Sequence, residues 1–209
     1  MTVVKTPEPV GVFSLSSLPS PLTIGSGKTL LIHIAKGARG GQLTHKAVFL
    51  DRDGVLTRER PDYVKTPEEL EILPGIGPPL QYLRKHGFRL VVVTNQSVVG
   101  RGLATHDEMV RIHEKLQSEL MRMGCMVDAI YYCPHLPGEG CSCRKPKPGL
   151  ILRAARDLWI DVSGSWMIGD KEIDLEAAKR AGCRGIRVQT NVGDLQNAVS
   201  SIIQSGEKG

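Results

Sequence analysis

The chain has 209 residues, of which 41% are apolar and 23% are charged, a composition typical of a globular protein. A chain of this length can bury a hydrophobic core without disulfide bonds. Its formal net charge is +5, but acidic residues are interspersed with the basic ones, and only three Phe and two Trp occur. These features argue against nucleic-acid binding, and an anionic small-molecule substrate explains the positive charge equally well.

The sequence also lacks the features of membrane and secreted proteins. No stretch approaches the roughly 20 apolar residues that a membrane-spanning helix requires, and Met1 to Val10 lack the pattern of a signal peptide. The chain contains five cysteines, an odd number, which argues against a disulfide framework. We therefore expect a cytoplasmic monomer with no membrane partner.

Composition divides the chain into three segments. Residues 1–45 contain four prolines, a serine-rich stretch and closely spaced glycines, which indicates an arm or linker of unknown role. Residues 46–203 carry the alternating patterns of a folded domain, and we expect residues 204–209 to form a flexible C-terminal tail.

Within residues 46–203, short apolar runs alternate with segments of helical periodicity. The runs, which suit strands buried on both faces, are 47–50, 89–93, 129–132, 166–168 and 185–188. The periodic segments are 78–86, 105–123, 147–158 and 172–181. This alternation predicts an α/β fold with a three-layer, Rossmann-like parallel sheet, in which ligands bind beyond the carboxyl ends of the strands.

The segment 105–123 gives the clearest helical signal. Thr105 and Glu108 have the spacing of a capping box. One apolar stripe, which we expect to be core, consists of Met109, Ile112, Leu116, Leu120 and Met123. We expect three histidines on or near predicted helices to be solvated or internally hydrogen-bonded: His86, His106 and His113.

A pair of aspartates directly follows the apolar run 47–50, in Asp51-Arg52-Asp53-Gly54. Because Asp51 and Asp53 are two residues apart, both carboxylates can face one cleft at the end of an extended strand. One can then attack phosphorus while the other protonates the leaving oxygen. Taken alone, the motif is equally typical of a structural turn.

Three later residues, each at a predicted strand end or helix start, supply the other groups that phosphoryl transfer needs. Thr94 offers a hydroxyl donor and Lys145 offers a point charge. Asp170 can complete a magnesium site with Asp51 and the carbonyl oxygen of Asp53. Each also has a structural alternative, namely a polar loop, a helix start and a helix N-cap. Their joint occurrence in this order favours a phosphoryl-transfer site.

A second constellation of possible ligands lies in residues 133–143: Cys133, His135, Cys141 and Cys143. Three thiolates and one imidazole match a tetrahedral zinc site. Because protein ligands fill all four positions, we expect a structural rather than a catalytic zinc. The alternative is a loop with free thiols. The remote Cys125 and Cys183 are expected to be buried as small apolar residues.

Five segments together resemble the haloacid dehalogenase superfamily, in particular its histidinol-phosphate phosphatase branch. They are Asp51-Arg-Asp-Gly54, Val92-Val-Thr-Asn-Gln-Ser97, Tyr131-Tyr-Cys-Pro-His135, Cys141-Ser-Cys-Arg-Lys-Pro146 and Gly169-Asp-Lys171. The resemblance covers about residues 46–190, and within the branch it extends to the heptose 1,7-bisphosphate 7-phosphatases. It implies a haloacid dehalogenase fold with a minimal cap and a zinc-binding loop.

The resemblance also implies roles for individual residues. Asp51 would be the nucleophile that forms an aspartyl-phosphate, and Asp53 would be the general acid and then the base. Thr94 and Lys145 would stabilise the transferring phosphoryl group. Asp51, Asp53 and Asp170 would hold Mg²⁺, and Cys133, His135, Cys141 and Cys143 would hold structural Zn²⁺. The implied substrate-binding residues are Arg60, Pro61, Asp62, Tyr63, Asn95, Gln96, Ser97, Arg144 and Lys171.

The implied activity is magnesium-dependent removal of the 7-phosphate from D-glycero-D-manno-heptose 1,7-bisphosphate. Histidinol phosphate is the alternative substrate, because Glu59 and Asp62 could bind its cationic amine. The loop after Asp53 is about one residue longer than the pattern and the zinc loop is short, which bears on the substrate. A non-catalytic zinc-stabilised interaction module is a further alternative, but it would need neither Asp51 nor Asp53.

Overall fold

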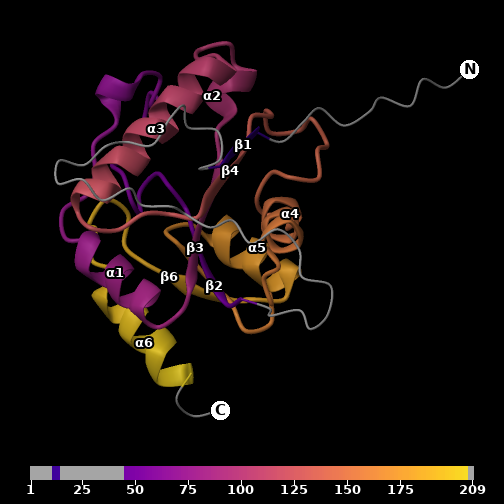
Figure 1. Ribbon diagram of the computed structural model, residues 1–209. Helices are drawn as coiled ribbons and strands as arrows, with labels where there is room; N and C mark the ends of the chain where they lie inside the picture. The colour runs from indigo at the N-terminus through magenta and orange to yellow at the C-terminus, as the bar shows by residue number, and fades with distance from the viewer. Residues whose placement is uncertain (1–10, 15–44, 207–209) are drawn as a thin grey trace, which may run out of the picture.

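The chain is built around a six-stranded sheet in the order β1-β4-β3-β2-β5-β6, as seen in a computed structural model that describes residues 11–14 and 45–206 (Figure 1). Five strands run parallel, as the sequence predicted: β2 (Ala47–Leu50), β3 (Arg89–Asn95), β4 (Ala129–Cys133), β5 (Trp166–Gly169) and β6 (Arg184–Arg187).

The remaining strand, β1 (Gly11–Ser14), pairs antiparallel with β4. It lies within the segment, residues 1–45, that we predicted to be an arm or linker, and apart from His45 the rest of that segment falls outside the described residues. Because β1 hydrogen-bonds to the outer side of β4, it covers an edge of the parallel sheet that would otherwise expose unpaired backbone groups.

Helices cover both faces of the sheet and complete the three layers. One face carries α1 (Gly77–Lys85), α3 (His106–Arg122) and α6 (Gln196–Gly206), and the other carries α4 (Gly149–Leu158) and α5 (Glu172–Ala181). In Figure 1, α1 lies beside α6, and α4 lies beside α5. The capping box predicted at the start of α3 is confirmed, since Thr105 Oγ1 accepts a hydrogen bond from Glu108 N–H.

Three helical segments were not predicted: α6, the short α2 (Ser97–Gly100) and the 3₁₀ turn η2 (Pro67–Glu69). Helix α6 corrects the expected boundary of the C-terminal tail, because residues 204–206 are helical. Val199 and Ile202 are buried in the core and anchor this helix. Such packing, more than intrinsic propensity, is what stabilises a short helix.

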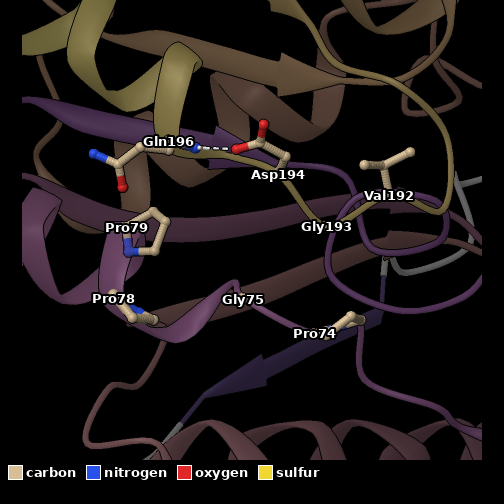
Figure 2. Close-up of a pocket in the computed structure, with 8 residues that line it drawn as sticks. All are labelled: Pro74, Gly75, Pro78, Pro79, Val192, Gly193, Asp194 and Gln196. Carbon is tan, nitrogen blue, oxygen red and sulfur yellow. Dashed lines mark hydrogen bonds between the residues drawn. The ribbon is translucent and has the colours of Figure 1, made fainter.

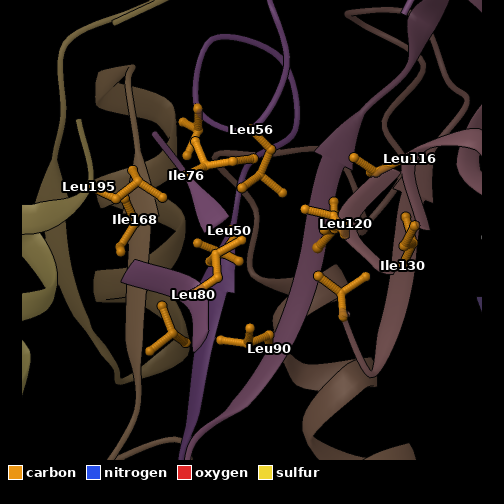
Figure 3. Packing of buried hydrophobic residues seen from close by; sticks show 14 of the residues in the cluster. Leu50, Leu56, Ile76, Leu80, Leu90, Leu116, Leu120, Ile130, Ile168 and Leu195 are labelled. Atoms are coloured by element: carbon orange, nitrogen blue, oxygen red, sulfur yellow. The ribbon is translucent and has the colours of Figure 1, made fainter. Parts of the chain in front are cut away.

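Alternate side chains of each central strand enter two separate hydrophobic clusters. Leu50 and Val92 pack with α1, α3 and α6, whereas Phe49 and Val93 pack with α4 and α5. The first cluster is shown in Figure 3, where Leu50 is surrounded by leucines and isoleucines from several elements. Because both faces are buried, these strands read as continuous apolar runs. Truncating such a side chain, as in Leu50→Ala, would cost about 2–5 kcal/mol of stability.

The strand order brings the polar motifs to one edge of the sheet. β2 lies between β3 and β5, with Leu50 paired to Val92 and Ile168, so the chain leaves these three strands side by side. Asp51, Thr94 and Asp170 therefore lie at neighbouring carboxyl ends, where α/β sheets bind their ligands. None of the helices in the described ranges is long and apolar enough to cross a membrane.

A pocket of about 300 Å³ lies between α1 and the segment before α6 (Figure 2). It is lined by Pro74, Gly75, Pro78, Pro79, Val192, Gly193, Asp194 and Gln196. Its one charged lining residue, Asp194, accepts a hydrogen bond from the backbone N–H of Gln196 at 3.1 Å. None of the polar motifs reaches this pocket, so it is not the candidate site.

Candidate active site and metal centres

Three carboxylates meet at the carboxyl ends of β2 and β5. Asp51 follows β2, Asp170 follows β5, and Asp174 lies in the first turn of α5. All three are buried, and one oxygen of each lies within 4.8 Å of the others. Buried carboxylates at this separation repel one another. The cluster therefore requires neighbouring cations.

Asp170 has an oxygen that is suited to binding such a cation. Its Oδ2 accepts a hydrogen bond from Thr190 Oγ1 at 2.8 Å, whereas its buried Oδ1 has no hydrogen-bond partner among the described residues. Gly54 allows this close packing, because its φ is +87° and a Cβ there would lie 2.5 Å from Asp170 Oδ2. A bare carboxylate oxygen beside Asp51 fits a hard cation such as Mg²⁺.

Lys145 supplies a permanent cation. Its Nζ lies 2.9 Å from Asp51 Oδ1 and 2.6 Å from Asp174 Oδ1, and only 2% of the residue is exposed. Asn95, the last residue of β3, holds its backbone: Asn95 Oδ1 accepts from Lys145 N–H at 3.0 Å, and Asn95 Nδ2 donates to Lys145 O at 3.1 Å. The lysine is therefore fixed at its backbone and at its ammonium group.

The charges of this cluster depend on one another. Burial raises the pKa of Asp51 to about 6, although Lys145 acts in the opposite direction. For Lys145, burial alone would lower the pKa, but Asp51 and Asp174 raise it above its ordinary value. The ammonium group therefore stays charged at neutral pH. A metal ion beside Asp51 would favour the ionised carboxylate that a nucleophile needs.

The Asp53 carboxylate is held by four hydrogen bonds. Oδ1 accepts from Arg52 Nε at 2.9 Å and from Thr57 Oγ1 at 3.1 Å. Oδ2 accepts from Arg52 Nη2 at 2.9 Å and from Gln96 Nε2 at 2.8 Å. Burial alone would raise the pKa of Asp53, but Arg52 and these hydrogen bonds lower it below its ordinary value. The same Gln96 amide donates to Thr94 Oγ1 at 2.9 Å, which leaves the Thr94 hydroxyl hydrogen available as a donor.

A cavity of about 420 Å³ adjoins Asp51 and Asp53, the two carboxylates predicted to be catalytic. Its lining is Asp51, Asp53, Glu59, Arg60, Pro61, Tyr63, Val64, Thr94, Asn95, Gln96, Ser97, Arg101, Pro137, Arg144, Lys171 and Ile173. Eight of the nine substrate-binding residues predicted from the sequence are in this lining. The ninth, Asp62, is not; its carboxylate pairs with Lys65 at 2.7 Å and with Arg60 at 3.3 Å on the surface.

The charged groups of the cavity wall are unequally paired. The Lys171 ammonium pairs with the Glu59 carboxylate, and Arg60 pairs with Asp62. Arg101 and Arg144 have no acidic partner within the described ranges: Arg101 lies over the Tyr63 ring at 5.5 Å from its centroid, and Arg144 Nη1 donates to His135 O at 3.1 Å. Two guanidinium groups are thus available to an anionic ligand.

The second ligand cluster has the dimensions of a tetrahedral metal site. Cys133 Sγ lies 3.8 Å from Cys141 Sγ, 3.2 Å from Cys143 Sγ and 3.4 Å from His135 Nδ1. Tetrahedral zinc, with Zn–S of about 2.3 Å and Zn–N of about 2.0 Å, separates its ligand atoms by roughly 3.5–3.8 Å. These ligands therefore fit zinc, and they leave no open position for substrate.

The chain around these ligands also supports the cavity. Gln96 N–H donates to Cys133 O at 2.7 Å, and Gly100 N–H donates to Pro134 O at 2.9 Å. Hydrogen bonding from Cys143 and burial raise the pKa of Cys133, and a bound cation would reverse this by favouring the thiolate. The metal loop is therefore joined by hydrogen bonds to the segment that carries Gln96.

Several residues of the site were missed in the sequence. Arg101 follows helix α2, which was too short to be predicted, and Thr190 comes from beyond β6. Arg52 lies within the first motif, but its complete burial was unexpected, because arginine is rarely buried unless it is paired. His113, expected to be solvated or hydrogen-bonded, is buried beside Arg52.

Comparison with known proteins identifies the family. The model of a HAD-hydrolase-like family matches residues 142–204. The D-glycero-beta-D-manno-heptose-1,7-bisphosphate 7-phosphatase of Bordetella bronchiseptica is 42% identical over 148 residues, which cover 71% of this chain and 83% of that protein. The chain belongs to this family of HAD-like hydrolases. A probable heptose-bisphosphate phosphatase from Thermoplasma acidophilum is 41% identical, over 66% of this chain and 87% of that protein.

Solved structures of the family agree with the fold. The B. bronchiseptica D,D-heptose 1,7-bisphosphate phosphatase, solved with magnesium and phosphate, superposes with a TM-score of 0.69 at 36% identity, over 78% of this chain and 99% of that chain. A HAD-like phosphatase from Mesorhizobium loti gives a TM-score of 0.66 at 28% identity, over 80% and 91% of the two chains. The haloacid dehalogenase fold expected from the motifs is thereby confirmed.

Proposed function

We propose that this protein is a magnesium-dependent phosphatase that removes the 7-phosphate from D-glycero-D-manno-heptose 1,7-bisphosphate. The observation that carries the proposal is Lys145, a buried cation held between Asp174 and Asp51, the second of which lines the 420 Å³ cavity. This arrangement places a fixed positive charge beside a carboxylate nucleophile. The names of similar proteins supply the substrate.

In the proposed reaction, Asp51 attacks phosphorus and forms an aspartyl-phosphate while the bond to the leaving oxygen breaks. Asp53 gives a proton to that oxygen, and then takes one from the water that hydrolyses the aspartyl-phosphate. The Lys145 ammonium group and the Thr94 hydroxyl stabilise the negative charge of the transferring phosphoryl group.

Asp51, Asp170 and the carbonyl oxygen of Asp53 would hold the Mg²⁺, as the unpartnered Asp170 Oδ1 indicates. Bound Mg²⁺ neutralises negative charge on the phosphoryl group. Asp174 has a different role in this proposal. Its Oδ1 pairs with Lys145 and its Oδ2 accepts from Lys171 N–H at 3.1 Å, so it orients the lysine.

The charges around the cavity favour an anionic sugar over histidinol phosphate. The cationic amine of histidinol phosphate would need a free carboxylate, but Glu59 is paired with Lys171 and Asp62 with Lys65. Arg101 and Arg144 can instead bind the second phosphate of a sugar bisphosphate, because a guanidinium matches phosphate geometry. This pairing of the acidic groups is the basis for preferring the bisphosphate.

A phosphate-release assay tests the proposal. Purified protein with Mg²⁺ is offered heptose 1,7-bisphosphate, histidinol phosphate and small phosphosugars, with Asp51→Asn as the inactive control. We expect the highest kcat/KM for heptose 1,7-bisphosphate. A preference for histidinol phosphate would refute the substrate assignment but keep the phosphatase, whereas full activity of Asp51→Asn would refute the mechanism.

A further inference from the structure

We propose that Arg52 is a positioning residue that fixes the Asp53 carboxylate for proton transfer at the leaving oxygen. The inference rests on the proposed function, in which Asp53 is the general acid. Arg52 is completely buried, and its planar guanidinium binds both oxygens of Asp53: Nε to Oδ1 and Nη2 to Oδ2, each at 2.9 Å. Such a two-point contact fixes the plane of the carboxylate as well as its distance.

The arginine is itself held in place by groups from other elements. Its Nη2 donates to Gln96 Oε1 at 2.9 Å, and its Nη1 lies 3.4 Å from His113 Nε2 and 3.5 Å from Met109 Sδ. Gln96 follows β3, whereas His113 and Met109 belong to α3. The orientation of Asp53 is therefore set by three separated parts of the sequence.

The geometry indicates a role in catalysis beyond filling the core. The Asp53 side chain is 23% exposed and lines the cavity. The buried arginine therefore binds the carboxylate on its inner side, while the exposed part of the carboxylate faces the substrate. Rotation of that carboxylate would break both bonds to Arg52. General acid catalysis contributes about 10²–10⁴-fold and requires hydrogen-bond geometry to the leaving oxygen. A lysine at position 52 would keep the charge but could not form the two-point contact.

Leaving-group chemistry separates positioning from a structural role. The leaving alkoxide of a sugar phosphate needs a proton, whereas p-nitrophenolate departs without one. kcat/KM covers the steps up to formation of the aspartyl-phosphate, so it reports on this proton transfer. We expect Arg52→Met to lower kcat/KM by about 10²-fold or more for the best sugar phosphate, but by less than about tenfold for p-nitrophenyl phosphate. Arg52→Lys should show the same selectivity to a smaller degree.

Thr57→Val provides a second test, because it removes one hydrogen bond to Asp53 Oδ1 and is close in size and shape to threonine. It should selectively lower kcat/KM for the sugar phosphate, by less than Arg52→Met does. This variant decides the question if Arg52→Met does not fold. The control is Arg89→Met, which replaces a paired arginine at the start of β3. It should change kcat/KM for neither substrate. Equal losses for both substrates, no loss, or full activity of Arg52→Lys would overturn the proposal. Failure of the proposed function would instead appear in the phosphate-release assay, either as an unmodified enzyme that releases no phosphate or as a fully active Asp51→Asn variant.

Discussion

The two clusters of metal-binding side chains differ in how completely the protein surrounds the space between them. In the cysteine cluster, three thiols and one imidazole occupy all four corners of a tetrahedron. In the aspartate cluster, Lys145 neutralises part of the charge, and Asp51 faces a cavity. A closed shell can only hold the chain together, whereas an open one leaves room for a substrate oxygen.

The two clusters are nevertheless parts of one segment. Cys143 is two residues before Lys145, and the carbonyl of His135 accepts a hydrogen bond from Arg144. A metal that fixes the loop therefore also fixes Lys145, which lies next to Asp51. We therefore predict that substitutions in the open aspartate cluster stop catalysis without unfolding the protein. Substitutions in the closed cysteine cluster should instead destabilise the fold first.

The largest effect is expected at Asp51. Asp51→Asn removes the proposed nucleophile and should lower kcat by about 10⁴-fold or more, with no aspartyl-phosphate formed. The fold should persist, since asparagine matches the size of aspartate and removes one of three mutually repelling buried charges. Phosphate release and thermal unfolding are measured on the same samples. Asp157→Asn, a partly exposed residue paired with arginines on α4, is the matched control and should retain activity.

At the closed cluster the order of effects should reverse. Cys141→Ser removes one ligand, so purified protein should fall from about one zinc per chain to less, and the free energy of unfolding should drop by about 3–5 kcal/mol. In a chain of this size that corresponds to a loss of roughly 6–20 °C in Tm. Metal analysis and calorimetry measure both.

Cys125→Ser is the matched control, because Cys125 is buried outside the zinc-ligand cluster and its thiol donates to Leu120 O. It should keep the zinc. A folded Cys141→Ser protein with unchanged Tm and full zinc would contradict the assignment, and so would an unmodified protein that folds without zinc.

The extent of prediction from sequence also differs between the two clusters. The cysteine cluster is local, so spacing within residues 133–143 was enough to find all four ligands. The aspartate cluster unites residues that are far apart, and the sequence found Asp51 and Asp170 only because strands end before them. Asp174 completes the cluster, and its contact with Lys145 depends on side-chain packing that no motif records.

The same reasoning explains the successes and failures in the fold. Five strands are short apolar runs and four helices carry helical periodicity, and all nine were found within about two residues of their observed ends. Helix α2 has too few residues to show a period, and α6 owes its stability to packing on α1. Arg52 was missed for a related reason: a charged residue inside a turn motif gives no sign that it will be enclosed by α3.

An intermediate effect is expected at Asp174, which separates orientation of Lys145 from neutralisation of Asp51. Asp174→Asn keeps an acceptor for Lys171 N–H but breaks a buried ion pair of 2.6 Å. Removing one partner of a buried ion pair costs about 3–5 kcal/mol of stability. Because Asp51 remains beside the lysine, we expect a smaller loss in this variant. We expect kcat to fall by about 10²-fold because the ammonium group is held by one carboxylate alone.

The control for Asp174→Asn lies two residues later in the same helix. Glu176→Gln removes a partly exposed carboxylate that pairs with Arg180 at 2.8 Å, and surface pairs of this kind are worth about 0–1 kcal/mol. It should leave kcat and Tm almost unchanged. Equal kcat values for the two variants would show that Asp174 does not orient the lysine.

The smallest effect is expected at Arg144, which lines the cavity and has no acidic partner among the residues that the structure describes. A hydrogen bond to a charged group contributes about 1.5–3 kcal/mol, so Arg144→Ala should lower kcat/KM for heptose 1,7-bisphosphate by roughly 10–150-fold. Histidinol phosphate has no second phosphate for this guanidinium to bind, so its kcat/KM should fall by much less. The preference between the two substrates should therefore narrow. Arg153→Ala, at a paired arginine on α4, controls for loss of surface charge and should change neither value. Equal losses for both substrates would place Arg144 at the transferring phosphoryl group beside Lys145 and would remove the distinction between the chemical and the recognition ends of the cavity.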